Sequence, residues 1–228
     1  MKILALECSA GPVSCAISEN GKIVSSRFAI TGLTHSQTLM PMVAEMLKSE
    51  SLTMNDIDGI AISYGPGSFT GIRIGISAAK GLATPRNLPC YPVSTLRAIA
   101  EEFRDTDCTL CAVMDARCNQ VYNALFRIKN GNIERLCPDR ALMIEELINE
   151  IKDIDDSIII AGDGFNLFKE YEGENIKLAD EVRHYQDADG VALSSSEVSP
   201  ISPDMLRPFY LRLPQAEREL KLKKEKMK

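Results

Sequence analysis

The sequence predicts an α/β fold of two lobes, in which mixed sheets are flanked by helices and the second lobe is reduced in size. Three observations predict it. The chain opens with three short apolar segments typical of antiparallel strands, followed by a helix, a strand and a second helix. A weaker repeat of the three-strand opening begins near Cys108. Between them, residues 60–83 combine a buried strand, a glycine turn and a long helix.

The first lobe is predicted over residues 1–104. Its strands are expected at residues 2–7, 13–18, 22–29, 58–63 and 90–93, and its helices at 34–49, 69–84 and 94–103. Asn20-Gly21 is a strong hairpin signal between two of these strands. Thr34 and Ser94 precede apolar residues at helical spacing and are expected to cap their helices. Glu101 is expected on the outer side of the last helix.

The second, smaller lobe is predicted over residues 105–202. Strands are expected at residues 108–115, at 120–127, after Asn130-Gly131 and at 157–161, and a helix at 140–151. A Gly-Asp-Gly turn follows at 162–164, and the polar region 173–200 gives no clear pattern. The apolar residues 208–212 predict a return to the first lobe, to which we assign residues 203–228.

Composition is typical of a globular protein outside the membrane, with 45% hydrophobic and 25% charged residues and no apolar run near the ~20 residues that span a bilayer. No signal-peptide pattern opens the chain, and seven cysteines lack disulfide-type spacing, so we expect a cytoplasmic protein. The net charge of −6 argues against nucleic-acid binding by this chain alone. Residues 216–228 carry six basic and three acidic side chains. They indicate either a solvated chain end or a segment that binds RNA or an acidic partner weakly through its charge.

Residues 60–83 carry the most specific pattern in the chain. Gly65 and Gly67 flank Pro66, which suits a tight turn, and Ser68 or Thr70 is expected to cap the following helix. The start of such a helix also offers backbone amides to an anion. A strand–turn–helix corner without a ligand is the simpler interpretation of these residues.

The helix after this turn has one nearly bare face, formed by Gly71, Gly75 and Ala78. Glycines inside a helix each cost roughly 1 kcal/mol relative to alanine, so we expect another backbone to pack closely against them. The preceding helix, residues 34–49, carries a stripe of methionines that suits an adaptable partner surface, although such stripes also form cores. The pattern therefore predicts that the two helices dock another protein.

The string Gly-Pro-Gly-Ser-Phe-Thr-Gly-Ile-Arg-Ile-Gly at residues 65–75, followed by Ala-Lys-Gly-Leu-Ala, resembles the signature of the TsaB family of tRNA threonylcarbamoyladenosine biosynthesis proteins. Shorter stretches agree in the expected order at residues 3–9, 35–41, 114–117, 121–122 and 210–212. TsaB is similar to the glycoprotease-like group of the actin and sugar kinase superfamily. The resemblance implies a two-lobed actin-like (ribonuclease H-like) fold.

The resemblance also implies a function. The chain would be a non-catalytic scaffold or activating subunit that pairs with the catalytic paralogue TsaD, and the assembly would install threonylcarbamoyl on the adenosine beside the anticodon. Further partners implied are the ATPase TsaE and tRNA, both through the complex, and a second copy of the chain in a homodimer. No intrinsic cofactor is implied, with ATP or ADP bound only at the level of the complex.

Two sets of site residues follow from the resemblance and the helix patterns. The partner-binding set comprises His35, Leu39, Met42, Val43, Met46, Gly71, Ile72, Gly75, Ile76 and Ala79. The nucleotide-binding set, by analogy with the superfamily, comprises Glu7, Ser9, Asp115, Gly162 and Gly164. Glu7 occupies a place where the superfamily more often has aspartate.

No catalytic or metal-binding residue is expected. The paralogue's pair of metal-binding histidines corresponds here to Ser94-Thr-Leu-Arg-Ala98, which offers no ligand. Cys108 and Cys111 face opposite sides of a strand, which favours two buried cysteines over a zinc pair. His35 and His184 have no nucleophile or orienting partner in the pattern, so a peptidase is disfavoured.

An enzyme remains the alternative hypothesis. It is a phosphotransferase of the sugar-kinase type that acts in the interlobe cleft, with Glu7 and Asp115 facing a metal.

Overall fold

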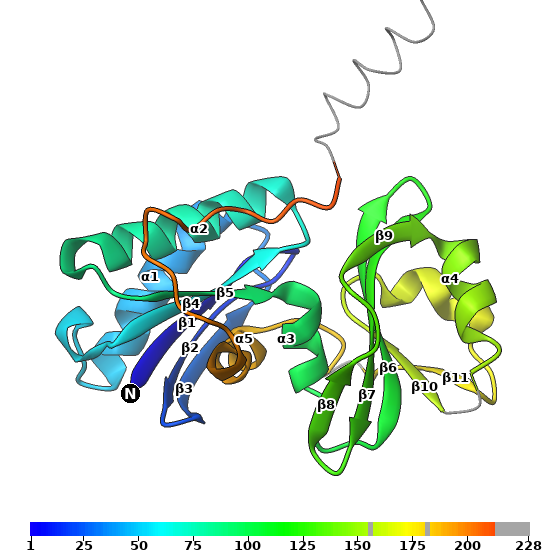
Figure 1. Cartoon of the computed structure of the whole chain (residues 1–228). Coiled ribbons are helices and arrows are strands. Elements are labelled where there is room, and N and C mark those ends of the chain that lie inside the picture. Colours follow the sequence, from blue (N-terminus) through cyan, green and yellow to red (C-terminus); the bar gives the residue numbers. More distant parts are fainter. Residues whose placement is uncertain (155–156, 181–182, 213–228) are drawn as a thin grey trace, which may run out of the picture.

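The structure is a computed structural model that describes residues 1–154, 157–180 and 183–212. Two mixed sheets lie side by side, with helices between them and on their outer faces (Figure 1). The predicted α/β architecture of two sheets flanked by helices is confirmed.

The first sheet has the strand order β3-β2-β1-β4-β5. Its strands are β1 (Lys2–Glu7), β2 (Val13–Glu19), β3 (Lys22–Ala29), β4 (Gly59–Gly65) and β5 (Cys90–Ser94). The first three are antiparallel, and β4 and β5 run parallel to β1. Asn20 and Gly21 take φ angles of 52° and 77°, which confirms the predicted hairpin turn.

The second sheet repeats this topology with the order β8-β7-β6-β10-β11, and β9 pairs with β7. Its strands are β6 (Cys108–Arg117), β7 (Gln120–Lys129), β8 (Asn132–Arg135), β9 (Arg140–Met143), β10 (Ile158–Ala161) and β11 (Ile176–Leu178). Again three antiparallel strands are followed by two that run parallel to the first. The internal repeat predicted from the sequence is therefore present in the strand order.

The helices form layers around the two sheets. They are α1 (His35–Ser49), α2 (Phe69–Ala83), α3 (Thr95–Glu101), α4 (Ile144–Ile151) and α5 (Ala188–Ser194), with the 3₁₀ helices η1 (Met54–Asp56), η2 (Thr84–Arg86), η3 (Phe165–Tyr171) and η4 (Ser195–Glu197). The pair α1 and α2 covers the outer face of the first sheet, and α4 that of the second (Figure 1). The pair α3 and α5 lies between the sheets.

Local capping sets the starts of α2 and α3. Ser68 Oγ accepts a hydrogen bond from Gly71 N at 3.3 Å, and Ser94 Oγ accepts one from Arg97 N at 3.2 Å. Of the two caps proposed for α2, Ser68 is therefore the one used. Before α1, the Thr34 N–H donates to Gln37 Oε1 at 3.3 Å.

Two local predictions were wrong. Residues 140–143 form strand β9 rather than the first turn of a helix, because they pair with β7 across the second sheet. Helix α3 ends at Glu101, and this carboxylate is buried rather than on the outer side. Helix α5 lies in the region 173–200, for which no element was predicted, and Asp187 caps it by accepting a hydrogen bond from Gly190 N at 3.0 Å.

Helix α5 packs on β1 and β2 of the first sheet, although its residues fall in the range 105–202 predicted to form the second lobe. Ala188 and Val191 meet Ala5 and Ala16 in this contact. A division of the chain that returns to the first lobe at α5, instead of near residue 203, is therefore the one we propose. Whether the lobes separate at residues 104 and 105 stays a prediction.

Over the described ranges, no helix is both long enough and apolar enough to cross a membrane. The basic segment 216–228 lies outside the described residues.

Candidate functional site

A cleft of about 400 Å³ lies between the two sheets. It opens where four central strands end, namely β1 and β4 of the first sheet and β6 and β10 of the second. Its lining residues are Ser9, Ala10, Gly11, Gly67, Ser68, Phe69, Met114, Asp115, Ala116, Arg117, Tyr122 and Asp163. Ligands of open α/β sheets bind outside the carboxyl ends of strands, and this volume falls in the range of small-molecule sites.

Two carboxylates lie together on the second-lobe side of this cleft. Asp163 Oδ1 accepts a hydrogen bond from Asp115 N at 3.2 Å, and Asp115 Oδ2 is 3.2 Å from Arg117 Nη1. Burial raises the pKa of Asp163 to about 6, and the negative charge of Asp115 adds to the shift. The cleft therefore combines an ion-paired carboxylate with one that gains a proton in mildly acidic solution.

The predicted nucleotide-binding residues are only partly brought together. Ser9 and Asp115 line the cleft, whereas Glu7, Gly162 and Gly164 do not. The two glycines serve close packing, since a Cβ at Gly162 would lie 1.9 Å from Val113 O and one at Gly164 would lie 3.0 Å from Asp115 N. That this set binds a nucleotide stays a prediction.

Several lining residues of the cleft, among them Asp163, Arg117 and Tyr122, are not in the predicted set of site residues. A signal existed for Asp163, because it stands between two glycines directly after an apolar strand. Arg117 and Tyr122 lie at the hairpin between β6 and β7, and the register of these two strands brings both residues to the cleft.

Glu7 is completely buried at the end of β1, where one carboxylate oxygen accepts a hydrogen bond from Ser9 N. Burial raises its pKa to about 7, although hydrogen bonds from Ser63 and Ser9 act in the opposite direction. Glu7 does not line the cleft, and the metal-facing role that the alternative hypothesis gives it stays a prediction.

This burial predicts a pH dependence of stability. Between the ordinary pKa of 4.5 and the folded value of about 7, the folded state binds more protons at Glu7 than the unfolded state does. The free energy of unfolding should therefore fall as pH rises through this window, by on the order of 3 kcal/mol from this group. The free energy of unfolding of Glu7→Gln, measured by urea unfolding from pH 5 to pH 8, should therefore decline less with pH than that of the wild type. A profile parallel to that of the wild type would contradict the assignment.

The partner-binding residues predicted on α1 and α2 require a correction. Leu39, Val43, Met46, Gly71, Ile72, Gly75, Ile76 and Ala79 are buried inside this chain, and only His35 and Met42 are partly exposed. The two glycines meet the chain's own backbone and sulfur, because a Cβ at Gly71 would lie 2.0 Å from Cys8 O and one at Gly75 would lie 2.6 Å from Cys8 Sγ. The two glycines of α2 therefore accommodate the turn after β1 instead of facing a neighbour.

The outer faces of the same helices remain exposed. On α1 the exposed residues include Gln37, Met40, Pro41, Ala44, Glu45 and Lys48, and on α2 they are Thr70, Arg73, Ser77 and Gly81. Gly81 differs from the buried glycines, because a Cβ there would meet nothing within 4 Å. We call these ten exposed residues, together with the partly exposed Ile74 and Ala78, the outer face.

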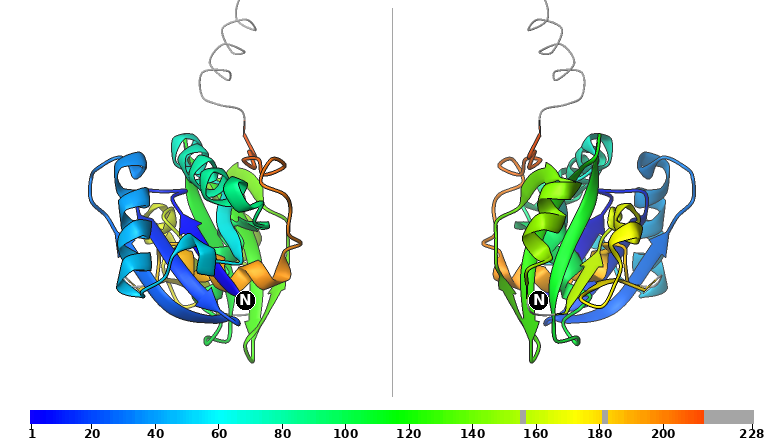
Figure 2. Two further views of the ribbon diagram at one scale, coloured as in Figure 1. Left: turned by 90° about the vertical axis from the view of Figure 1, so that its left-hand side faces the viewer. Right: turned by 90° about the vertical axis from the view of Figure 1, so that its right-hand side faces the viewer.

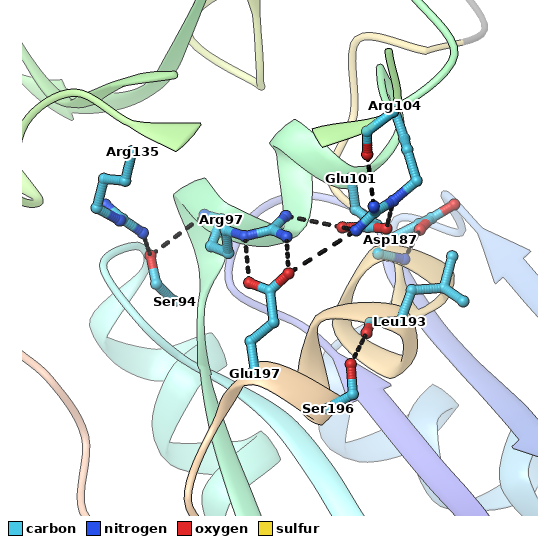
Figure 3. Close-up of polar contacts among 11 residues, drawn as sticks. Ser94, Arg97, Glu101, Arg104, Arg135, Asp187, Leu193, Ser196 and Glu197 are labelled. Atoms are coloured by element: carbon cyan, nitrogen blue, oxygen red, sulfur yellow. Dashed lines mark hydrogen bonds and ion pairs between the residues drawn. The ribbon is translucent and has the colours of Figure 1, made fainter. Parts of the chain in front are cut away.

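Helix α3 occupies the place where the catalytic paralogue was expected to carry histidines, and its polar side chains are engaged in ion pairs (Figure 3). Arg97 donates to Glu197 at 2.6 and 2.9 Å and to Glu101 at 2.8 Å. Arg104 contacts the same Glu101 and donates to Gly131 O at 2.7 Å. The network thus joins α3 to η4 and to the turn between β7 and β8.

The cysteines and histidines occupy structural positions. Cys108 and Cys111 pack into different core clusters on the two faces of β6, as predicted, but Cys108 is only partly buried. His35 Nε2 lies 3.3 Å from Gly11 O, and His184 is buried with Nδ1 3.1 Å from Asp180 O. Within residues 1–154, 157–180 and 183–212, no group of three or more His, Cys, Asp or Glu side chains is arranged to hold a metal ion.

Comparison with known proteins identifies the family. A family model described as TsaD, tRNA N6-adenosine threonylcarbamoyltransferase, matches residues 29–195. The chain belongs to this family. Among curated members, the tRNA threonylcarbamoyladenosine biosynthesis protein TsaB of Bacillus subtilis is 29% identical over 95% of this chain and 96% of its own length. The protein of the same name from Escherichia coli is 35% identical over 66% of this chain and 65% of its own length. The resemblance to TsaB inferred from the sequence is confirmed.

Solved structures agree with this family and with the actin-like fold. YeaZ from Pseudomonas aeruginosa superposes with a TM-score of 0.79 and 25% identity, covering 92% of this chain and 99% of that one. The (R)-2-hydroxyglutaryl-CoA dehydratase component A of Acidaminococcus fermentans superposes with a TM-score of 0.53 at 11% identity, covering 86% of this chain and 98% of that one, and shows the fold alone.

Proposed function

We propose that this protein is a non-catalytic, activating subunit in the formation of threonylcarbamoyladenosine on tRNA, and that it pairs with a catalytic paralogue of the TsaD type. The names of the TsaB relatives, of which the Bacillus subtilis protein matches 95% of this chain, support the pathway. The engagement of Arg97 and Glu101 in structural ion pairs supports a non-catalytic role, because the helix that would carry metal ligands is committed to holding the fold together.

The observation that carries the pairing is the outer face of α1 and α2. Ala44, Ser77, Ala78 and Gly81 are small, and helices approach closely where such residues lie. Gly81 makes no contact that explains a residue costing roughly 1 kcal/mol inside a helix. Close approach of a partner helix would explain it. We therefore move the docking surface from the buried residues to the outer face.

A charge on the outer face should abolish pairing without unfolding the protein. Ser77 is exposed in the middle of α2, so Ser77→Arg should change the free energy of unfolding by no more than about 0.5 kcal/mol. Affinity for the TsaD paralogue should fall at least ~100-fold, because an arginine at the centre of a close helix contact is buried without a partner. Size-exclusion chromatography and calorimetry with the purified paralogue measure this.

The matched control is Asn149→Arg. Asn149 is exposed on α4 of the second lobe, so this variant should pair with the paralogue as the wild type does. Equal affinity of Ser77→Arg and wild type would refute the surface. Sedimentation of each variant alone tests whether the same face forms a homodimer. TsaE and tRNA are then expected to join only when the paralogue is present.

The cleft supports a second candidate, a nucleotide-dependent phosphotransferase. Its position at the carboxyl ends of strands from both sheets, with Asp115 and Asp163 on one wall, favours a polar ligand. Calorimetry of the isolated chain with magnesium and ATP, combined with a turnover assay, separates the candidates. Tight binding with turnover supports the enzyme, and binding only in the presence of the paralogue supports the subunit.

A further inference from the structure

The C-terminal segment, residues 203–212, follows α2 along its length and then reaches the second lobe (Figures 1 and 2). Near the end of α2, Lys80 Nζ donates to Asp204 O at 3.5 Å. Near its start, Arg73 Nε donates to Tyr210 Oη at 2.7 Å, and the Tyr210 ring stacks on Phe69 with centroids 4.6 Å apart. We call this segment the clamp.

The clamp is seated in the turn between β4 and α2. Phe209 N donates to Tyr64 O at 2.8 Å, and the two aromatic rings stack with centroids 5.4 Å apart. A Cβ at Gly65 would lie 2.3 Å from Phe209 O, so only glycine allows this approach. The first of the motif glycines therefore serves to hold the clamp on the first lobe.

The last described residues of the clamp contact the second lobe. The Arg212 guanidinium donates to the carbonyl oxygens of Ala116 and Arg117, and Leu211 packs against the core cluster that includes Ala116. Ala116 and Arg117 line the cleft on the second lobe, and Phe69, under Tyr210, lines it on the first. Over three residues the clamp thus touches both rims of the cleft.

We propose that the clamp sets the opening of the interlobe cleft and that a protein docked on the outer face of α2 changes this opening through it. The coupling has a direct route, because Arg73 holds Tyr210 of the clamp and is itself exposed on the outer face. A docked protein that engages Arg73 competes with this hold and shifts the balance between lobe arrangements. The effect of a docked protein on the cleft rests on the proposed function, whereas the effect of the clamp on the cleft does not.

The test measures the distance across the cleft in the full-length protein. Spin labels are placed on Cys118, which is exposed at the turn between β6 and β7 on the second lobe, and on Ser36→Cys, which is exposed at the start of α1. Double electron–electron resonance then gives the distribution of distances between the two labels. Arg212→Ala removes the hydrogen bonds from the Arg212 guanidinium to the second lobe and should widen this distribution roughly twofold, since the lobes lose a direct tie between the rims.

Arg207→Ala is the matched control. Arg207 lies in the clamp, and among the described residues its guanidinium donates to Asp204 O and Leu206 O, both within the clamp, so this variant should keep the wild-type distribution. Thermal unfolding of each variant verifies that both fold. Wild-type distances in Arg212→Ala would overturn the proposal, whether or not the protein has a partner.

Addition of the TsaD paralogue tests the coupling. The distances should shift in the wild type and in Arg207→Ala, whereas Arg212→Ala should pair with the paralogue without the same shift. An equal shift in Arg212→Ala would overturn the coupling and leave the docking surface intact. Failure of the wild type to pair would overturn the proposed function, and the comparison of the free proteins would still decide whether the clamp holds the lobes.

Discussion

Gly71→Ala should destabilise the protein by about 3 kcal/mol or more, although alanine is the better helix former. Gly71 lies in the first turn of α2, and a Cβ there would lie 2.0 Å from Cys8 O in the turn after β1. Cys8 O is a backbone atom and the position of the Cβ is fixed by the backbone of α2, so the clash is relieved only if the helix moves off the sheet. The Cys8 thiol, which donates to Gly71 O at 3.3 Å, would lose its partner in that movement.

Gly81→Ala on the same helix is the matched control. A Cβ at Gly81 meets nothing within 4 Å, so the substitution should stabilise the free protein by roughly 0.5–1 kcal/mol through helix propensity alone. Urea unfolding of both variants gives the comparison. Similar stabilities in the two variants would show that α2 does not lie as close to Cys8 as the structure places it.

These two glycines show how far the sequence could predict the site. Glycines inside a helix correctly indicated a close approach of another backbone, and the capping residue and the turn were also found. The pattern could not tell whether that backbone belongs to the chain itself or to a partner, because spacing along a helix carries no information on the identity of a neighbour. Ile72 and Ile76, which were predicted to contact a partner, lie instead in the first-lobe core beside the glycines that fit the turn after β1.

Elements defined by local signals were predicted well, and those defined by long-range contacts were not. The hairpin at Asn20-Gly21 and the cap at Ser94 depend on neighbouring residues. The strand β9, by contrast, exists through its pairing with β7, and its apolar residues alone suit a helix equally well. Helix α5 has one clear local signal, Asp187, but its small residues gain meaning only in packing, since a Cβ at Gly190 would lie 2.3 Å from Ala98 O on α3.

Glu101→Gln should destabilise the protein by about 3 kcal/mol. The Glu101 side chain is 2% exposed, and its carboxylate forms ion pairs with Arg97 at 2.8 Å and with Arg104 at a shorter distance. Arg97 is itself 9% exposed, so loss of the carboxylate charge leaves a buried guanidinium with Glu197 as its only acidic neighbour among the described residues. Glu134→Gln is the control, because its pair with Arg127 spans 3.4 Å between side chains that are 66% and 50% exposed, and its loss should change stability by about 0.5 kcal/mol or less.

A double variant separates the cost of an orphaned charge from the value of the pair. Arg97→Met with Glu101→Leu removes both buried charges and leaves the half-exposed Glu197 and Arg104 to solvent. Buried ion pairs replaced by apolar residues often cost little, so the double variant should be more stable than Glu101→Gln in urea unfolding. In that case the network contributes to the arrangement of α3 against η4 more than to stability, which fits a helix whose polar residues position the two lobes. A double variant less stable than Glu101→Gln would instead show that the ion pairs themselves stabilise the fold.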